Sequence, residues 1–149
     1  MRQSIPHAGI GVDVIVGFPG ESDADFNDTY QFIKGLDISY LHVFTFSERA
    51  GTPAASMSGS VPVNIRRERN EILTGLSDQK RSKFYDSFLQ TNRKVLAEKS
   101  YNMGTYSGFT DNYIKVNFES DRNIENTIVN VHLERINEEN EVMGRIVLL

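Results

Sequence analysis

The spacing of apolar and polar residues changes twice along this chain and divides it into three stretches. In the first, Gly9–Gly17 is almost continuously apolar and rich in β-branched residues, which is typical of a strand buried on both faces of a parallel sheet. Ser22 and Asp25 then have the spacing of a capping box, and the apolar residues after them share one helical face. A second apolar strand is expected over Ile38–Phe46, so this stretch predicts a right-handed βαβ unit.

The second stretch predicts a long helix. Ala50–Pro62 is rich in serine, glycine and proline and is a candidate linker. Pro62 suits the start of a helix, because its missing N–H is not needed there. An intermittent apolar stripe then continues for about 25 residues, or roughly 40 Å of helix. Gly75 in its interior marks a candidate bend.

In the third stretch, apolar residues alternate with polar ones, as in half-buried strands. The alternation is clearest over Ile114–Phe118 and Val129–Leu133. The expected strands are Lys94–Lys99, Gly104–Thr110, Tyr113–Glu119, Thr127–Ile136 and Val142–Leu148. Five short strands joined by polar turns predict a small antiparallel β-barrel of the OB-like type.

Together the stretches predict a mixed α+β chain, with a βαβ piece at residues 1–60, a connecting helix at 61–91 and the barrel at 92–149. A two-stranded βαβ unit cannot cover both faces of its sheet, and about 60 residues are too few for a stable α/β domain. We therefore expect the chain to be the C-terminal part of a longer protein. Its unpaired strand edge near Gly9–Gly17 is then free to pair with a second copy, so a truncation-driven homodimer is also expected.

The amino-acid composition excludes several kinds of functional site and segment. The 149 residues include no cysteine, which excludes disulfides, thiolate nucleophiles and cysteine-ligated zinc or iron–sulfur clusters within the chain. Its uncharged stretches are far shorter than the roughly 18 apolar residues of a membrane span, and no secretory signal is visible. Residues 61–99 carry 9 Lys/Arg and 5 Asp/Glu, whereas residues 1–60 and 100–149 are each net −4. A basic helix can meet phosphate, but a solvated helix face is the simpler interpretation.

Three sequence blocks follow one another in an informative order: VDVIVGFPGES from Val12, LHVFTFSERAGTPAA from Leu41 and VPVNIRRER from Val61. They resemble the C-terminal half of the radical S-adenosylmethionine methylthiotransferases, and most closely the subgroup that acts on threonylcarbamoyladenosine beside the tRNA anticodon. The resemblance covers nearly the whole chain. It implies that the two strands are the last of a partial (β/α) barrel and that the small barrel is an RNA-binding TRAM domain.

The resemblance also implies cofactors and partners. The full-length enzymes use S-adenosylmethionine and two four-iron four-sulfur clusters, and the clusters are held by cysteines. This chain is therefore expected to lie downstream of every cluster ligand, to bind neither cluster and to be inactive alone. The implied partner is the anticodon region of tRNA, with no membrane, and the implied location is the cytoplasm.

For S-adenosylmethionine, the resemblance points to Asp13, Gly17 and Phe46. Asp13 is the only charge in its apolar strand, and a buried carboxylate needs a partner, either the cofactor's ribose or amino group or a backbone turn. Gly17 begins the loop at the sheet end where open α/β sites lie, and a tightly packed loop is the alternative. Phe46 stands where the family usually has tyrosine, and it is expected against adenine or in the core. Arg49 is expected to pair with a substrate phosphate or carboxylate, or merely with Glu48.

Rings and cations of the barrel are candidates for RNA contact, because OB-like surfaces hold nucleic acid by stacking and charge. With the basic helix, the predicted RNA-binding residues are Arg66, Arg67, Lys99, Tyr106 and Lys115. Further residues on the same surfaces are Arg69, Tyr101, Phe109, Tyr113 and Arg122. Since residues 100–149 are net −4, RNA contact requires local clustering of cations.

Two other functions stay open at this point. The first is a non-enzymatic RNA-binding protein built on the OB-like barrel, and the second is a purely structural interaction module. Binding of tRNA by this chain alone favours the first, and failure to bind at low salt favours the second. His7, His42 and His132 lack metal-ligand spacing and are interpreted as structural or solvated.

Overall fold

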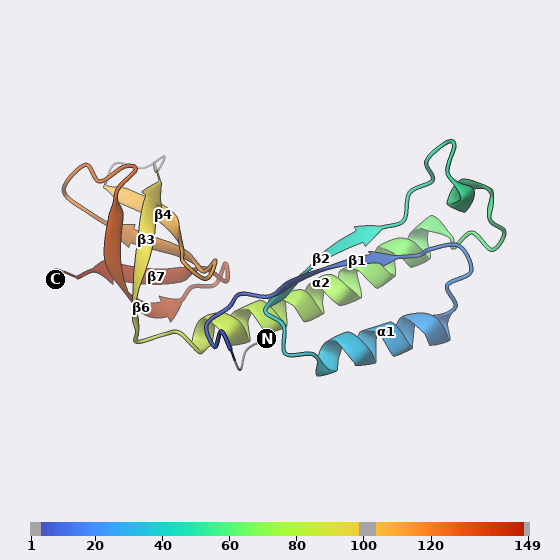
Figure 1. Ribbon diagram of the computed structural model, residues 1–149, viewed down its shortest axis with the longest axis horizontal. Helices are drawn as coiled ribbons and strands as arrows, with labels where there is room; N and C mark the ends of the chain where they lie inside the picture. Colours follow the sequence, from blue (N-terminus) through green and yellow to red (C-terminus); the bar gives the residue numbers. More distant parts are fainter. Residues whose placement is uncertain (1–3, 99–103, 148–149) are drawn as a thin grey trace. The chain divides into compact units, whose positions relative to one another are not determined.

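The computed structural model describes residues 4–98 and 104–147 and separates them into two compact units (Figure 1). One unit is formed by residues 10–80, and the other by residues 4–9 together with the described residues from 81 onward. Helix α2 (Val63–Asp86) contributes most of its length to the first unit and its last turns to the second. Each unit has a hydrophobic core of its own.

The first unit contains the βαβ arrangement that the sequence predicts. Strand β1 (Gly11–Val16) pairs in parallel with β2 (Tyr40–Thr45), and helix α1 (Asp23–Gly35) connects them. The capping box at the start of α1 is confirmed. Ser22 Oγ accepts a hydrogen bond from the Asp25 N–H at 3.2 Å, and the Asp25 carboxylate accepts one from the Ser22 N–H at 2.9 Å. The hydrogen bonds with Ser22 lower the pKa of Asp25, which keeps a negative charge at the positive end of the helix.

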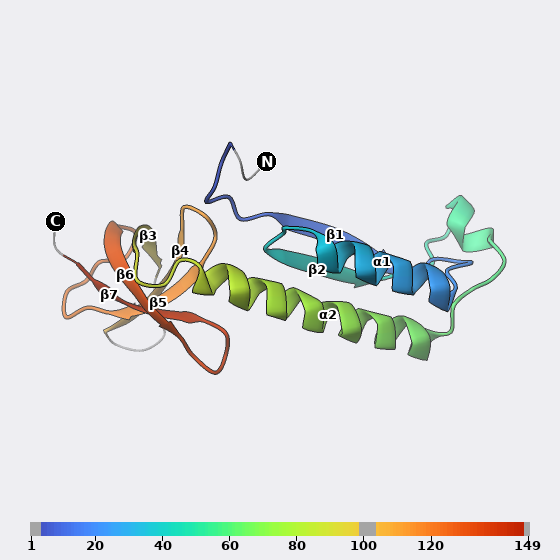
Figure 2. The same ribbon diagram turned by 90° about the horizontal axis from the view of Figure 1, so that it is seen from below.

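The core of this unit lies on one face of the β1–β2 pair. Both helices pack against that face, and Figure 2 shows them on the same side of the strands. Its buried residues are Val16, Ile33, Leu41, Leu73 and Leu76. The opposite face is open, with Ile15 59% and Phe44 53% exposed. The prediction of a strand buried on both faces is therefore wrong for the described residues, because both helices take the same face of a two-stranded sheet.

Helix α2 begins directly after Pro62, as predicted, and runs through Gly75 without interruption over 24 residues. Ser77 fixes it to β2 through a buried pair of hydrogen bonds. The Ser77 hydroxyl accepts from the Leu41 N–H at 2.8 Å and donates to the Leu41 carbonyl at 3.1 Å. The predicted linker contains one short 3₁₀ turn, η1 (Pro53–Ser56). In the part of the chain that the structure describes, no helix is long and apolar enough to cross a membrane.

The second unit is a closed five-stranded barrel. Its strands are β3 (Asn92–Glu98), β4 (Thr105–Thr110), β5 (Lys115–Glu119), β6 (Ile128–Ile136) and β7 (Val142–Ile146). They follow the order β3-β4-β5-β7-β6, with β6 pairing back to β3. The paired strands are antiparallel except for β5 and β7, which are parallel. The small barrel predicted from the alternating pattern is confirmed.

Alternate strand residues, with Ile114 just before β5, fill the barrel core. The fully buried ones are Val95, Ala97, Ile114, Val116, Phe118, Val131, Leu133 and Val142. Phe84 and Tyr85 from the end of α2, and Phe88 just after it, belong to the same core. The last turn of α2 is therefore part of the barrel unit, because its aromatic side chains complete the barrel's apolar interior.

Leu133→Ala should destabilise the barrel strongly. Leu133 is fully buried, and removing its side chain loses apolar burial and leaves a cavity, which costs about 2–5 kcal/mol. Leu96→Ala is the matched control, because Leu96 is a leucine of β3 that is 47% exposed, and its loss should cost less than about 1 kcal/mol. Urea denaturation followed by circular dichroism measures both free energies of unfolding. Equal losses would contradict the assignment of inward and outward faces.

Candidate functional site

The carboxyl ends of β1 and β2 lie at the same end of the parallel pair, where open α/β proteins place their ligand sites. Three segments meet there: the loop after Val16, the segment after Thr45 and the N-terminal part of α2. They are held together by two buried arginines of α2, Arg66 and Arg69.

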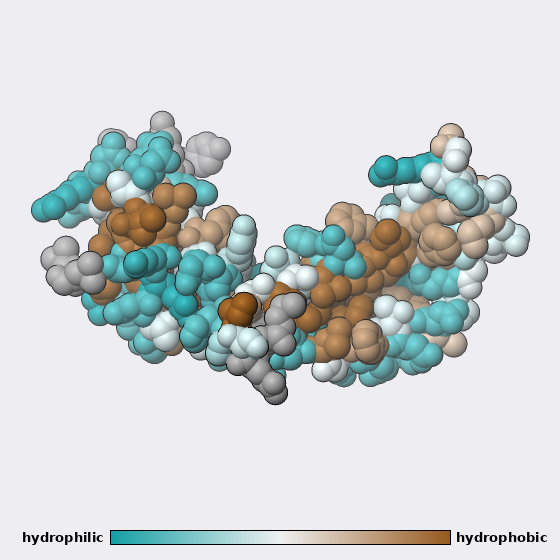
Figure 3. Space-filling model, in the orientation of Figure 1, coloured by the Kyte–Doolittle hydropathy of each residue, from teal (hydrophilic) through white to brown (hydrophobic). Residues whose placement is uncertain are grey.

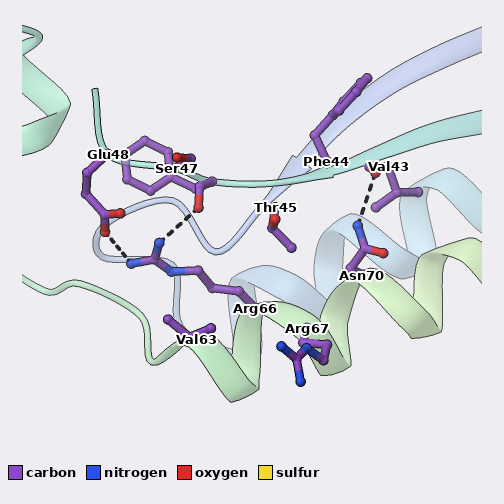
Figure 4. A pocket seen from close by; sticks show the side chains of 10 residues that line it. Val43, Phe44, Thr45, Ser47, Glu48, Val63, Arg66, Arg67 and Asn70 are labelled. Atoms are coloured by element: carbon purple, nitrogen blue, oxygen red, sulfur yellow. Dashed lines mark hydrogen bonds and ion pairs between the residues drawn. The ribbon is translucent and has the colours of Figure 1, made fainter. Parts of the chain in front are cut away.

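The guanidinium of Arg66 is almost fully satisfied by protein acceptors. Nε donates to the Val61 carbonyl at 2.7 Å, and Nη1 donates to the Phe46 carbonyl at 2.9 Å. Nη2 donates to the Glu48 carboxylate at 2.6 Å and to Ser60 Oγ at 2.8 Å (Figure 4 shows the bond to Glu48). The hydrogen bond from Arg66 lowers the pKa of Glu48, which keeps this acceptor ionised. The side chain of Arg66 is only 6% exposed, so the geometry gives it a positioning role and offers no support for the predicted RNA contact.

Gly17 lies directly against the aliphatic stem of Arg66. Its φ is +77°, and a Cβ at this position would clash with Arg66 Cγ. Both the left-handed conformation and the lack of space require glycine. The tightly packed loop considered as an alternative is therefore present at Gly17, and its contact with S-adenosylmethionine stays a prediction.

Glu21, which the sequence analysis did not single out, holds the same loop from the other end. One carboxylate oxygen accepts from the N–H groups of Gly17 at 2.7 Å and Phe18 at 3.3 Å. The other accepts from Arg69 Nη1 at 2.8 Å, and Arg69 also pairs with Asp23 at 2.7 Å. Glu21 ends the GFPGE run of the first sequence block, so the motif contained it. Its arginine partner lies 48 positions along the chain, which local spacing does not reveal.

The open face of the β1–β2 pair carries Asp13, beside His42 in the strand register, followed by Ile15 beside Phe44. Figure 3 shows apolar side chains gathered along the strands of this unit. Asp13 is exposed, so the prediction of a buried carboxylate is wrong. The physical reason is the same as for the strand, because Asp13 points to the face that neither helix covers. Its contact with S-adenosylmethionine remains a prediction.

Arg49 lies at the end of this open face. It lines a depression of about 390 Å³ together with Ile15 and Phe44, and it is exposed. Glu48, the alternative partner of Arg49, pairs with Arg66 at 2.6 Å. A cation beside two apolar side chains can hold an anionic group next to an aromatic or aliphatic one.

A second depression of about 550 Å³ shares Phe46 with the first and reaches α2. The ring of Phe46 is half-buried and meets Phe18 edge-on, with centroids 5.2 Å apart. Arg67 and Asn70 line this depression from α2, and Asn70 is tied to the strand by a 3.1 Å bond to the Val43 carbonyl. Arg67 is exposed, as its predicted contact with RNA requires.

The barrel residues predicted to bind RNA differ in how far their side chains are already engaged within the protein. The ring of Tyr106 stacks on Phe118 in the core with centroids 6.3 Å apart, and its hydroxyl donates to the Arg122 carbonyl at 3.2 Å. Its ring is therefore committed to the core. Lys99 and Tyr101 lie outside the described residues.

Lys115 is engaged in an ion pair on the barrel surface. Its Nζ donates to Glu141 at 2.6 Å, and Glu141 also accepts from Asn117. The hydrogen bond to Glu141 raises the pKa of Lys115, and the bond from Lys115 lowers the pKa of Glu141. With 44% of its side chain exposed, Lys115 can still reach a phosphate.

The histidines have ordinary partners. His7 meets the Phe88 ring edge-on, and His132 bonds through Nδ1 to Asn92 at 2.7 Å. Among the residues that the structure describes, no three or more His, Cys, Asp or Glu side chains come together in a way that could hold a metal ion.

The fold and site define a two-unit α+β protein, in which loops clamped by buried arginines end a βαβ unit and a small closed barrel forms the other unit. No family model matches the chain. Its sequence is 36% identical over 137 residues to threonylcarbamoyladenosine tRNA methylthiotransferase MtaB of Bacillus subtilis, which covers 89% of this chain and 30% of that protein. A protein of the same name from Thermotoga maritima is 38% identical over 122 residues, covering 82% of this chain and 28% of that protein.

A second kind of relative matches over a similar length. The tRNA-2-methylthio-N(6)-dimethylallyladenosine synthase of Acetivibrio thermocellus is 33% identical over 138 residues, covering 91% of this chain and 29% of that protein. This chain belongs to the radical S-adenosylmethionine methylthiotransferase family, as its three sequence blocks indicate. It spans about 30% of the length of these relatives.

Arg66→Lys should destabilise the βαβ unit. A lysine has one donor group and cannot reach the four acceptors that the guanidinium serves, so the loss should be about 2 kcal/mol or more. Arg67→Lys, at the exposed neighbouring position, is the control and should stay within about 0.5 kcal/mol of the parent. The measurement is the free energy of unfolding in urea. A neutral Arg66→Lys substitution would show that the network does not hold the loops.

Glu141→Gln should destabilise the barrel more at neutral pH than in acid. Because the pKa of Glu141 is lowered from its ordinary 4.5 in the folded state, its stabilisation is complete above that value and is lost as the pH falls below it. For a partly exposed pair we expect about 1 kcal/mol or less at pH 7 and a smaller loss at about pH 3. Urea titrations at the two pH values test this, with exposed Glu138→Gln as the control. A loss that persists undiminished in acid would exclude the ion pair as its cause.

Proposed function

We propose that this chain is the C-terminal part of a tRNA methylthiotransferase, in which the βαβ unit completes the cofactor- and substrate-facing end of the catalytic domain and the barrel is a TRAM-like RNA-binding module. The observation that carries the proposal is the open face of β1 and β2. Toward the carboxyl ends of the parallel strands it exposes the apolar side chains of Ile15 and Phe44, and it ends there at the Arg49 depression. A monomeric soluble fold has no reason to leave large apolar side chains exposed on one strand face unless something covers them.

The residues of this face fit S-adenosylmethionine. Ile15 and Phe44 offer apolar surface for an adenine ring, and the exposed Asp13 carboxylate offers an acceptor for ribose hydroxyls or an ammonium group. S-adenosylmethionine, when bound, supplies the radical chemistry of the family. The chain has no cysteine and does not fit an iron–sulfur cluster, so the two clusters belong to other parts of the full-length enzyme.

The names of the relatives support two candidate substrates. Two of those described above are named for threonylcarbamoyladenosine in tRNA and one for dimethylallyladenosine. We take threonylcarbamoyladenosine beside the anticodon as the target of the full-length enzyme. Over most of the chain those relatives are 36% and 38% identical, against 33% for the third. Two other dimethylallyladenosine synthases are 44% and 42% identical, but over only 95 and 79 residues. Arg49 then suits the carboxylate of the threonyl group or a nearby phosphate, since a guanidinium binds either one with paired hydrogen bonds.

A segment exchange tests the proposal. This chain replaces the matching segment of the Bacillus subtilis relative, and the hybrid is produced in cells that lack that enzyme. Mass spectrometry of nucleosides from total tRNA should detect methylthio-threonylcarbamoyladenosine. The same exchange into the Acetivibrio thermocellus relative should give a smaller fraction of methylthiolated nucleoside than the Bacillus subtilis hybrid. The reason is that the substrate-facing residues of this chain then belong to a different subgroup from the rest of the hybrid. A soluble hybrid that gives no product in either background would refute the proposal.

Within the hybrid, Arg49→Ala should lower the methylthiolated fraction about tenfold or more, because a charge-assisted contact is worth about 1.5–3 kcal/mol. Arg49 is exposed, so the hybrid should fold as before. Lys34→Ala, an exposed cation on α1, is the control and should leave the product unchanged. Full activity of the Arg49→Ala hybrid would show that Arg49 does not contact the substrate.

A further inference from the structure

Four large apolar side chains stand exposed together on the outside of the barrel. They are Leu96, Phe109, Tyr113 and Ile128, with exposed fractions of 47%, 43%, 70% and 70%, and are called the outer patch below. Leu96 on β3 is the register partner both of Phe109 on β4 and of Ile128 on β6, so three of them form one row across neighbouring strands. The rings of Phe109 and Tyr113 lie beside each other with centroids 6.0 Å apart. In Figure 3, apolar atoms also gather on the barrel surface among hydrophilic ones.

Tyr113 occupies the outer patch in a backbone conformation that disfavours it. Its φ is +67°, a left-handed value that glycine and asparagine adopt easily and bulky residues rarely do. Hydrogen bonds hold the turn around it. Tyr113 N–H donates to the Thr110 carbonyl at 3.1 Å, and Thr110 Oγ1 accepts from Ile114 N–H at 2.9 Å. The protein therefore keeps a strained tyrosine whose ring is mostly in water, a combination that points to binding.

The charges around the outer patch suit a polyanion that also has flat apolar groups. Lys115 is the register partner of Phe109 on β5, and Lys94 flanks Leu96 on β3. Two of the nearby acids are paired, since Glu141 is bound by Lys115 and Asp111 accepts from Arg93 at 3.4 Å. A third, Glu98, flanks Leu96 on the side opposite Lys94. The remaining outward neighbours, Asn130, Ser107 and Asn117, are uncharged.

This position on the barrel also matches its topology. β4 and β5 are the second and third strands of a five-stranded barrel, and that face holds oligonucleotides in OB-like proteins. Bases of single-stranded nucleic acid stack on exposed aromatic rings, whereas bases inside a duplex are already stacked and cannot. Tyr106, the ring proposed from sequence, is committed to the core, so the exposed pair takes its place.

We propose that the outer patch is a stacking platform for unpaired bases of tRNA, with Phe109 and Tyr113 as the two rings and Lys94 and Lys115 as the phosphate contacts. The proposal rests on the function proposed above and names the surface through which the barrel binds RNA. It assigns most of the binding free energy to stacking, so affinity depends on the rings more than on salt.

The test measures binding of the 149-residue chain to a fluorescently labelled anticodon stem–loop RNA, and to the fully paired duplex of the same length, at low and physiological salt. We expect the stem–loop to bind more tightly. Phe109→Ala with Tyr113→Asn should weaken stem–loop binding tenfold or more, since each stacked base contributes about fivefold or more to affinity. Phe32→Ala, which removes a 69% exposed ring on α1, is the matched control and should have no effect.

The melting temperature separates binding from folding. Tyr113→Asn relieves the left-handed strain, so its melting temperature should stay the same or rise while its affinity for the stem–loop falls. If the parent chain binds and the double variant binds equally well, or if the duplex binds as tightly as the stem–loop, the platform is wrong and the proposed function stands. If the parent chain binds neither RNA at low salt, both the platform and the RNA-binding role of the barrel are overturned.

Discussion

The loops at the carboxyl ends of β1 and β2 depend on one buried charge, the guanidinium of Arg66. Burying a charge is costly unless its hydrogen bonds are satisfied, and here two backbone carbonyls, a hydroxyl and a carboxylate satisfy them. The carbonyls of Phe46 and Val61 belong to segments just beyond β2 and just before α2, where no regular ladder provides partners. At this end of the unit, Arg66 therefore provides the hydrogen bonds that a strand or helix would otherwise provide to these carbonyls.

The same constraint explains why three distant sequence blocks occur together. The first block provides Gly17, whose missing side chain leaves room for the stem of Arg66, and Glu21, which binds Arg69. The second block provides Glu48, and the third provides both arginines. A substitution in one block therefore leaves a buried charge without a partner, or a loop without its packing contact, in another block. The motifs are thus one network of contacts, and their joint presence is stronger grounds for a family resemblance than any single string.

The sequence predicts which elements form better than it predicts what covers them. The capping box at Ser22, the helix start after Pro62 and the barrel strands follow from local spacing, and the structure has them all. The expected burial of Asp13 is wrong, and the basic helix face interpreted as solvated has Arg66 buried. Both differences have one cause, because the spacing of residues shows which face a side chain is on but not what packs against that face. Apolar continuity over β1 indicates two buried faces, yet the described residues supply helices for only one. Glu21 escaped notice because its partner is remote in sequence.

The two arginine networks also change how the basic middle of the chain is understood. Arg66 and Arg69 are neutralised by Glu48, Glu21 and Asp23, so part of the net positive charge of this region holds its own loops and is not available to RNA. A barrel that follows a neutralised helix and is itself acidic gains little from bulk electrostatics. Stacking on exposed rings does not require a positive potential, and a few well-placed lysines suffice to hold the backbone beside them. An acidic barrel with a strained, exposed tyrosine is therefore consistent with RNA recognition that depends on unpaired bases more than on phosphate charge.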